Sequence, residues 1–248
     1  MDQFIRTKMI YGEEAMLQLQ KSHVAIFGVG GVGGYVAESL ARTGVFHFTL
    51  IDNDVVSLSN INRQIIADTT TIGRPKVEVM KERILAINPN ANVETKNLFF
   101  LGDKDEDIDF EAFDYIVDAI DTVKAKIALA IKANEFNVPI ISSMGAGNKV
   151  DPMGFVVTDI SKTEMDPLAK VIRVELRKRG VRHLKVVYSK ERPVEPIKYY
   201  LDNEETNTKR SVPGSNAFVP TACGLLIASE VVRDLTERVA RDALKRER

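Results

Sequence analysis

The chain has 248 residues, of which 44% are hydrophobic and 28% charged, and its formal net charge is −1 at pH 7. This balance creates no overall field that would attract nucleic acid or an anionic membrane, and no apolar run approaches the length of a membrane span. The N-terminal stretch lacks the apolar core of a signal peptide. The single cysteine, Cys223, excludes an internal disulfide and a cysteine-based zinc site. We therefore expect a cytoplasmic protein that needs no zinc.

A short helix is predicted at Glu13–Lys21, and a nucleotide-type pattern follows it. Val24–Phe27 is an apolar run typical of a buried parallel strand. Tyr35–Thr43 has helical spacing, and Phe48–Ile51 reads as a second strand. Between the first strand and the helix a G-x-G-x-x-G turn is formed by Gly28, Gly30 and Gly33, with Gly31 and Gly34 in addition.

This strand–turn–helix–strand unit places phosphates at a helix N-terminus, because glycines let the backbone approach them closely. Asp52, directly after the second strand, is placed to accept hydrogen bonds from a ribose. The pattern by itself favours NAD, and a glycine turn used only for tight packing is the simpler alternative.

The segment after Asp52 is polar and lies beyond the strand ends, where a ligand binds in such folds. Gly73-Arg74-Pro75-Lys76 then opens a helix with Pro75 in its first turn, and Asn88-Pro89 ends it. A guanidinium at Arg63 and an ammonium at Lys76 suit a triphosphate undergoing transfer better than a passively held dinucleotide. The candidate cofactor-binding residues here are Asp54, Ser59, Asn60, Arg63, Gln64 and Lys76.

Two aspartates follow the next pair of predicted strands. Asn92–Lys96 reads as a strand, Gly102–Glu111 as an acidic, solvated surface segment, and Tyr115–Asp118 as a buried strand that runs on to Asp121. Carboxylates beside phosphate ligands suit Mg²⁺, so Asp121 is the candidate metal ligand and Asp118 a second cofactor-binding candidate. A helix-capping or loop role is the alternative for Asp118.

The rest of the chain continues the alternation of strands and helices. We expect helices at 123–136, 166–179 and 216–240, the last with Pro220 in its first turn, strands at 139–143 and 155–160, and a mobile crossover loop at 191–213. Small residues at 142–147 leave room for a substrate. Cys223 falls among apolar helix positions, which favours a buried small hydrophobe over a nucleophile.

These elements predict an α/β fold: a Rossmann-like, mostly parallel twisted sheet with helices on both faces, a C-terminal antiparallel extension and a crossover loop. We expect a single domain over residues 1–248, with a nucleotide-binding core at 1–160 and a part for substrate, crossover and dimerisation at 161–248. Residues 169–192 hold nine Lys and Arg against two Glu, a local balance of +7. Such a stretch suits a phosphate backbone, although a solvated helix face explains it equally well.

The motifs resemble those of the ubiquitin-activating-enzyme-like superfamily of bacterial adenylyltransferases, the MoeB/ThiF/HesA group. Its characteristic elements stand here as G-V-G-G-V-G at 28–33, Asp52, S-N-I-N-R-Q at 59–64, Lys76 and D-A-I-D at 118–121. The resemblance implies ATP, Mg²⁺ and adenylation of a carboxylate. It implies Asp52 at the ribose, Asn60, Arg63 and Lys76 at the phosphates, and Asp121 at the metal. It also implies a homodimer in which Arg6 reaches the partner's site.

Sulfur-carrier activators of this superfamily typically have two C-x-x-C pairs and often a catalytic cysteine, and this chain has neither. It is most similar to a branch that dehydrates a threonylcarbamoyl-modified adenosine in tRNA, through G-A-G-N-K-V-D-P at 145–152 and V-Y-S-K-E at 187–191. That implies tRNA as substrate, ATP-dependent activation of the threonylcarbamoyl carboxylate, and cyclisation without a thioester. The alternatives are activation of a ubiquitin-like sulfur-carrier protein, an NAD-dependent dehydrogenase and a non-catalytic RNA-binding module.

Overall fold

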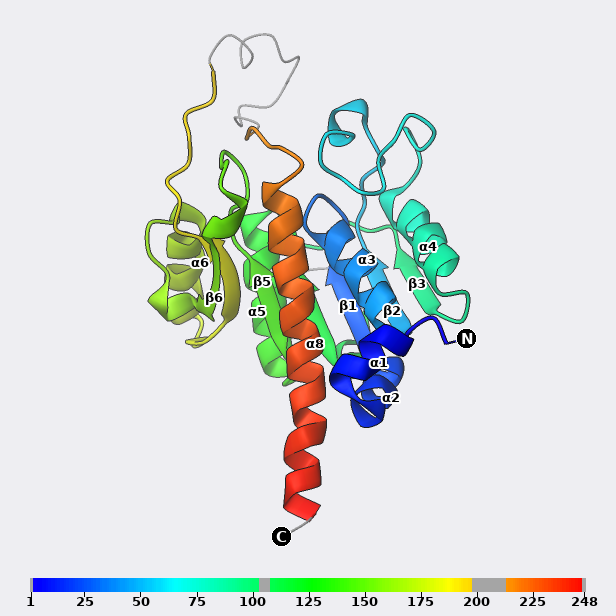
Figure 1. Ribbon diagram of the computed structural model, residues 1–248. Helices are drawn as coiled ribbons and strands as arrows, with labels where there is room; N and C mark the ends of the chain where they lie inside the picture. The colour runs from blue at the N-terminus through cyan, green and yellow to red at the C-terminus, as the bar shows by residue number, and fades with distance from the viewer. Residues whose placement is uncertain (1, 103–107, 198–212, 247–248) are drawn as a thin grey trace.

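The computed structural model describes residues 2–102, 108–197 and 213–246, with side chains of the last helix described as far as Glu237. Its centre is a seven-stranded sheet in the order β3-β2-β1-β4-β5-β7-β6 (Figure 1). All neighbouring strands are parallel except β6 and β7, which are antiparallel. The strands are β1 His23–Phe27, β2 His47–Ile51, β3 Asn92–Lys96, β4 Tyr115–Asp118, β5 Ile140–Ser143, β6 Phe155–Asp159 and β7 Lys185–Ser189.

Helices cover both faces of the sheet. One face carries α2 Glu13–Lys21, α3 Gly33–Thr43, α4 Lys76–Ile87 and α8 Val219–Arg246, and the other carries α5 Val123–Glu135 and α6 Pro167–Lys178. Helix α1 Ile5–Tyr11 precedes α2. Short 3-10 helices lie at Leu58–Asn60, Phe110–Ala112, Pro152–Gly154 and Ile160–Lys162. No helix in the described part of the chain is long and apolar enough to cross a bilayer.

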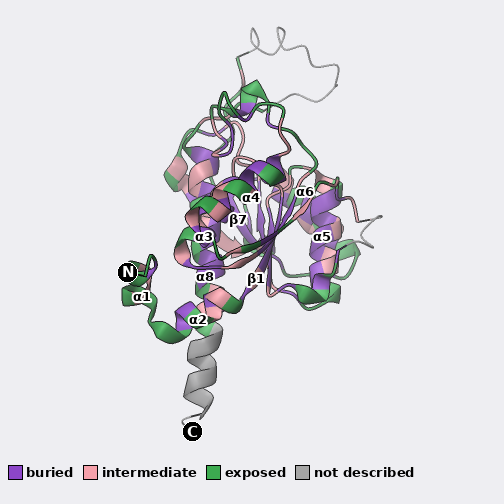
Figure 2. Ribbon diagram, turned by 90° about the vertical axis from the view of Figure 1, so that its right-hand side faces the viewer, coloured by how far each residue is buried: buried purple, intermediate pink, exposed green. Residues whose placement is uncertain are grey.

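The central strands are buried on both sides, as Figure 2 shows by the purple at the middle of the sheet. Side chains alternate between the two faces of a strand, so Val24 and Ile26 of β1 pack with the helices of one face, and Ala25 and Phe27 with those of the other. Because both faces are covered, the strands read as continuous apolar runs in the sequence. The expected doubly covered, mostly parallel sheet is therefore confirmed.

The C-terminal helix α8 crosses the face of the sheet beside α3 (Figure 1). Asn216 begins it, since its Oδ1 accepts hydrogen bonds from the backbone N–H of Phe218 and of Val219, both at 2.9 Å. Pro220 lies in its first turn, as predicted. Gly224 permits close contact with α3, because a Cβ there would lie 2.5 Å from the carbonyl oxygen of Val32.

Several sequence-based expectations need correction. Helix α1 and strand β7 were not predicted, and Pro75 is the residue before α4 rather than part of its first turn. The acidic segment expected to be solvated carries Ile108 and Phe110, which are buried in the core. The predicted mobile crossover overlaps residues 198–212, which lie outside the described residues.

The expected division at residue 160 crosses the sheet. Strand β7 comes from the second part of the chain, yet it lies between β5 and β6 of the first part. The two predicted parts therefore share one sheet. In the predicted helix at 216–240, the apolar side chains of Phe218 and Leu225 were expected to face the core, but both are exposed.

Candidate nucleotide-binding and catalytic site

A cavity of about 610 Å³ lies at the carboxyl edge of the sheet. It extends from the glycine turn after β1, past Ala119–Asp121 after β4, to Gly145–Gly147 after β5. Strands β1 and β4 are neighbours, but the helices that follow them cover opposite faces. Ligands of open α/β sheets bind at such a switch point, because the diverging connections leave a crevice there.

The glycine turn is shaped by close backbone contacts. Gly28 has φ +90°, and a Cβ on it would lie 2.6 Å from the carbonyl oxygen of Ala119. A Cβ on Gly33 would lie 1.8 Å from the carbonyl oxygen of Gly28, so this glycine serves the packing of α3 against the turn. Gly30 and Gly31, between them, line the cavity. The turn thus presents bare backbone at the start of α3, as phosphate binding requires.

Asp52 joins the end of β2 to the glycine turn. Its Oδ2 accepts the backbone N–H of Val29 at 2.7 Å, and its Oδ1 accepts that of Asp54 at 2.8 Å. Burial raises the pKa of this carboxyl above its ordinary value, while the Lys76 ammonium and the two backbone N–H groups act in the opposite direction. The carboxylate lines the cavity in a fixed orientation, where its remaining lone pairs can accept ribose hydroxyl groups.

Two cations face the same cavity. Lys76 is the first residue of α4, is 5% exposed, and donates from Nζ to Oδ2 of Asp54 at 2.7 Å. Arg63 donates from Nη1 to the carbonyl oxygen of Ser59 at 2.7 Å and to Oδ1 of Asn62 at 2.8 Å. These contacts hold both charges in place and leave other donors of each group for a polyphosphate.

The other polar residues of this segment divide into two groups. Gln64 lines the cavity, and its Oε1 is buried without a hydrogen-bond partner. Its Nε2 lies 3.7 Å from where a Cβ of Gly30 would be, so the amide faces the glycine turn. Asn60 and Ser59 are outside the cavity wall. Asn60 instead accepts the backbone N–H of Ser57 at 3.1 Å, which shapes the turn that carries Arg63.

Asp121 also lines the cavity and is exposed. Its Oδ1 accepts a long hydrogen bond, 3.3 Å, from Oγ1 of Thr122. Among the described residues no group of three or more His, Cys, Asp and Glu side chains could hold a metal by itself. A lone carboxylate facing a phosphate site nevertheless fits Mg²⁺, which commonly takes one or two carboxylates together with substrate phosphates and water.

Asp118 lies in a different place from the one expected. It is fully buried and outside the cavity wall. Its Oδ1 accepts from Lys126 Nζ at 3.0 Å and its Oδ2 from Ser142 Oγ at 2.5 Å. Lys126, which the sequence reasoning missed, does line the cavity and also donates to the carbonyl oxygen of Ser143 at 2.7 Å. A lysine among the apolar residues of α5, the helix that follows Asp118 in the chain, was the available signal.

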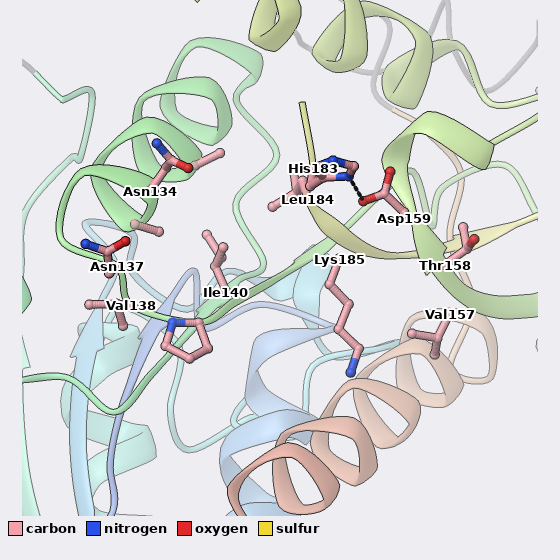
Figure 3. Close-up of a pocket in the computed structure, with 13 residues that line it drawn as sticks. Asn134, Asn137, Val138, Ile140, Val157, Thr158, Asp159, His183, Leu184 and Lys185 are labelled. Atoms are coloured by element: carbon pink, nitrogen blue, oxygen red, sulfur yellow. Dashed lines mark hydrogen bonds and ion pairs between the residues drawn. The ribbon is translucent and has the colours of Figure 1, made fainter. Parts of the chain in front are cut away.

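A second cavity, also of about 610 Å³, lies at the opposite, amino edge of the sheet (Figure 3). Its ionisable groups are already paired: Asp159 Oδ2 lies 3.2 Å from His183 Nδ1, and Lys185 Nζ lies 2.8 Å from Asp234 Oδ2 and 2.7 Å from Glu230 Oε2. No glycine turn borders it. The carboxyl-edge cavity is therefore the one equipped for a nucleotide.

Arg6, the remaining predicted site residue, is far from both the glycine turn and Asp121. It is exposed on α1, and α1 is anchored by Phe4, whose ring centroid lies 5.8 Å from that of Phe46. Phe46 immediately precedes β2, so Arg6 lies at the amino edge of the sheet (Figure 1). Within one chain it does not reach the cavity.

The basic stretch is not a uniformly positive surface. Arg173 donates to the carbonyl oxygens of Ile160 and Thr163, and Lys185 pairs with carboxylates of α8. Arg179 and Lys178 pair with Glu175. The exposed charges that remain include Arg177 and Arg182, where α6 ends at the amino edge of the sheet.

Comparison with known proteins places this geometry in context. A sequence profile of the ThiF family matches residues 3–247. The chain is 42% identical over 243 residues to the tRNA threonylcarbamoyladenosine dehydratase of Bacillus subtilis, and the match covers 96% of each protein. Crystal structures of the Escherichia coli tRNA N6-threonylcarbamoyladenosine dehydratase with ATP and with AMP each superpose with a TM-score of 0.86 at 34% identity, covering 96% of both chains.

Proposed function

This chain belongs to the ThiF family, and we propose that it uses ATP to adenylate the carboxylate of the threonylcarbamoyl group on a tRNA adenosine and then closes that group into a ring. The supporting observation is the gathering, around one cavity, of the glycine turn, Asp52, Arg63, Lys76 and Asp121. The same fold binds ATP and AMP in the Escherichia coli dehydratase. Overall the reaction removes water from the modified nucleoside, with ATP converted to AMP and pyrophosphate.

In the first step the threonyl carboxylate attacks the α-phosphorus of ATP in line, and pyrophosphate leaves. Negative charge is spread over the phosphoryl oxygens, so positioned cations supply most of the stabilisation. Arg63 and Lys76 supply such cations: Arg63 lies beside Gly31 of the glycine turn, and Lys76 lines the cavity at the start of α4. Asp52 orients the ribose, and the unpartnered amide oxygen of Gln64 can accept a hydrogen bond from a donor group of the bound ligand.

Asp121 is the residue we assign to Mg²⁺, with its carboxylate facing the cavity. When bound, Mg²⁺ would neutralise phosphate charge and help pyrophosphate to leave. Asp54, whose Oδ2 lies 2.7 Å from Lys76 Nζ, holds that lysine at the start of α4 until phosphates compete for it. Asp118 acts indirectly, because it holds Lys126 beside Ser143, at the end of the cavity where we place the threonylcarbamoyl group.

In the second step the carbamoyl group of the same side chain attacks the acyl carbon, and AMP leaves. Both partners belong to one molecule and are held close, so the step gains from proximity and needs no protein nucleophile. Cys223 agrees with this, since it is fully buried and burial raises the pKa of its thiol to about 11. A thiol of that kind is almost entirely protonated at neutral pH.

The test is mass spectrometry of nucleosides from threonylcarbamoyladenosine-containing tRNA incubated with the protein and ATP. We expect a nucleoside lighter by one water, formed only with ATP and together with AMP. A matched reaction in which NAD replaces ATP is the control for dehydrogenase chemistry. Absence of the dehydrated nucleoside, combined with pyrophosphate exchange that requires a ubiquitin-like carrier protein, would instead assign the chain to carrier activation.

A further inference from the structure

The acceptor end of the cavity, near Gly145, has a buried carboxylate behind its wall. Asp166 precedes α6 and is 7% exposed. Its Oδ1 accepts the backbone N–H of Ala169 at 2.9 Å and so caps the helix. Its Oδ2 is buried without a hydrogen-bond partner. A buried carboxylate oxygen without a donor is costly, which makes it a place where a ligand's N–H or O–H group is expected.

This oxygen faces the cavity wall at a glycine. Gly145 lines the cavity, and a Cβ on it would lie 3.8 Å from Asp166 Oδ2. Because Gly145 has no side chain, none of its own atoms beyond the backbone separates the cavity from the carboxylate. Leu168, two residues after Asp166, also lines the cavity. The carboxylate thus lies directly behind the part of the wall on the β5 side, away from the glycine turn.

A buried lysine balances the charge of Asp166. Lys149 is 4% exposed, and its Nζ lies 3.9 Å from Asp166 Oδ2 and donates to the carbonyl oxygen of Ser189 at 3.1 Å. Burial lowers the pKa of Lys149, while the nearby Asp166 and Glu191 act to raise it. At 3.9 Å the lysine provides charge but no hydrogen bond to the carboxylate, so Oδ2 keeps its capacity to accept a proton.

Hydrogen bonds also hold the backbone of Lys149 and of the residues on either side of it. Asn216 Nδ2 donates to the carbonyl oxygen of Lys149 at 3.0 Å, and the Glu191 carboxylate accepts the backbone N–H groups of Val150 and Asp151. Asn148, just before, has φ +57° and pairs with Gly214 through its backbone and side chain. The Asp166–Lys149 pair is therefore built into a rigid part of the site, and nothing in the adenylation step uses it.

We propose that Asp166 accepts the proton in the ring-closing step, a role that rests on the proposed function. The carbamoyl group forms its new bond to the acyl carbon, the bond from that carbon to the phosphate oxygen breaks, and AMP leaves with the bonding electrons. The N–H proton of the carbamoyl group passes to Oδ2 of Asp166, which later releases it to water. Lys149 is a positioning residue that stabilises the negative form of this carboxylate.

Asp166→Asn is the informative change, because asparagine still caps a helix with Oδ1 but places an N–H donor where Oδ2 was. We expect the first turnover of pyrophosphate release from ATP and modified tRNA to stay within about threefold of the parent. Formation of the dehydrated nucleoside should fall by on the order of 10²–10⁴, as for loss of a general base. The acyl-adenylate should accumulate and be captured by hydroxylamine as a hydroxamate.

Asp159→Asn is the matched control, since Asp159 also caps a short helix but lies at the amino edge of the sheet. It should leave both steps unchanged. Asp166→Ser, another capping residue without a carboxylate, repeats the test should the amide distort the site. Equal slowing of both steps, or an unchanged second step in folded variants, overturns the role of Asp166. A parent protein that forms no dehydrated nucleoside would instead refute the proposed function.

Discussion

At the scale of single residues, the cavity combines fixed anions and cations within one wall. The backbone N–H of Val29 in the glycine turn orients the carboxylate of Asp52, and the carboxylate of Asp54 orients the ammonium of Lys76. Preorganised charges stabilise a transition state without reorganising during the reaction. The cost of removing one of them should therefore appear in the rate of the first step more than in nucleotide binding.

The first prediction concerns the three charged residues of the cavity wall. Separate changes of Arg63, Lys76 and Asp121 to alanine should each lower AMP formation by on the order of 10²–10³, as expected for loss of one charge partner of the transition state. Lys81→Ala is a control on α4, because Lys81 is outside the cavity wall. Parent-like AMP formation by Asp121→Ala in the presence of Mg²⁺ would remove the metal role.

The second prediction concerns Cys223. Its Sγ lies 3.4 Å from Ser143 Oγ in the buried interior, and burial raises its pKa to about 11. Cys223→Ser should keep parent-like turnover, because no thioester is formed. The free energy of unfolding should fall by about 1–3 kcal/mol, the cost of burying a hydroxyl in place of a thiol. A trapped covalent adduct at Cys223 during turnover, found by intact mass spectrometry, would contradict the thiol-free mechanism.

At the scale of elements, helix α8 connects the C-terminal part of the chain to the start of the glycine turn. Pro220 lines the cavity, and Gly224 lies against Val32 just before α3. We predict that Gly224→Ala lowers the free energy of unfolding by about 1–2 kcal/mol, because overpacking against backbone outweighs the gain in helix propensity. Urea denaturation measures this. Ser229→Ala, exposed on the same helix, should change stability by at most about 0.5 kcal/mol.

The next prediction is that the basic side chains at the C-terminal end of α6 bind tRNA. Replacing Arg177, Lys178, Arg179 and Arg182 together by glutamine should weaken tRNA binding and flatten its dependence on salt, since phosphate contacts release counterions. ATP binding should not change, because none of the four residues lines the cavity.

A control variant carries Lys21→Gln, Arg42→Gln, Lys81→Gln and Lys132→Gln, the same change in charge on other helices. Titration at several salt concentrations compares the two. The pairing of Lys178 and Arg179 with Glu175 limits the expected loss to about two phosphate contacts. An unchanged salt slope would mean that tRNA docks elsewhere.

Helices and strands with a regular apolar pattern were the ones that the sequence predicted correctly. Helix α2 and strand β3 have the predicted boundaries, because a regular apolar pattern and clear end signals define them. Strand β7 was missed because its charged neighbours, and Lys185 within it, made it read as part of a basic stretch. Ile108 and Phe110 were missed because acidic neighbours surround them, although they pack beside Phe27 and Phe113.

The same limits apply to the site. The glycine turn, Asp52, Arg63, Lys76 and Asp121 follow strand ends in a recognisable order, so sequence reasoning brought them to one edge of the sheet. Lys126 pairs with Asp118, and Asp166 pairs with Lys149. Neither pair follows a recognisable motif, so only the fold shows that these side chains meet.

At the scale of the whole molecule, the sheet separates two functional edges. The nucleotide cavity is at the carboxyl edge, whereas Arg6 and the end of α6 are at the amino edge (Figure 1). Exposed apolar side chains include Met9 at 79% and Ile10 at 78% on α1, and Phe218 at 68% just before α8. We propose that a second copy of the chain covers the neighbouring apolar side chains of α1, Met9 and Ile10.

The last prediction is therefore a homodimer in which Arg6 completes the partner's cavity. Arg6 does not reach the cavity of its own chain, so a catalytic role requires it to act across an interface. Arg6→Ala and Asp121→Ala should each be nearly inactive alone. Mixed and allowed to exchange subunits, they should regain up to about a quarter of parent activity, because half of the dimers are mixed and each mixed dimer has one intact site.

Two preparations of Asp121→Ala mixed in the same way form the control and should stay inactive. If subunit exchange is demonstrated by mass spectrometry of the mixture and activity does not return, Arg6 has no role across the interface. A protein that sediments as a monomer at the assay concentration while fully active would exclude the arrangement altogether.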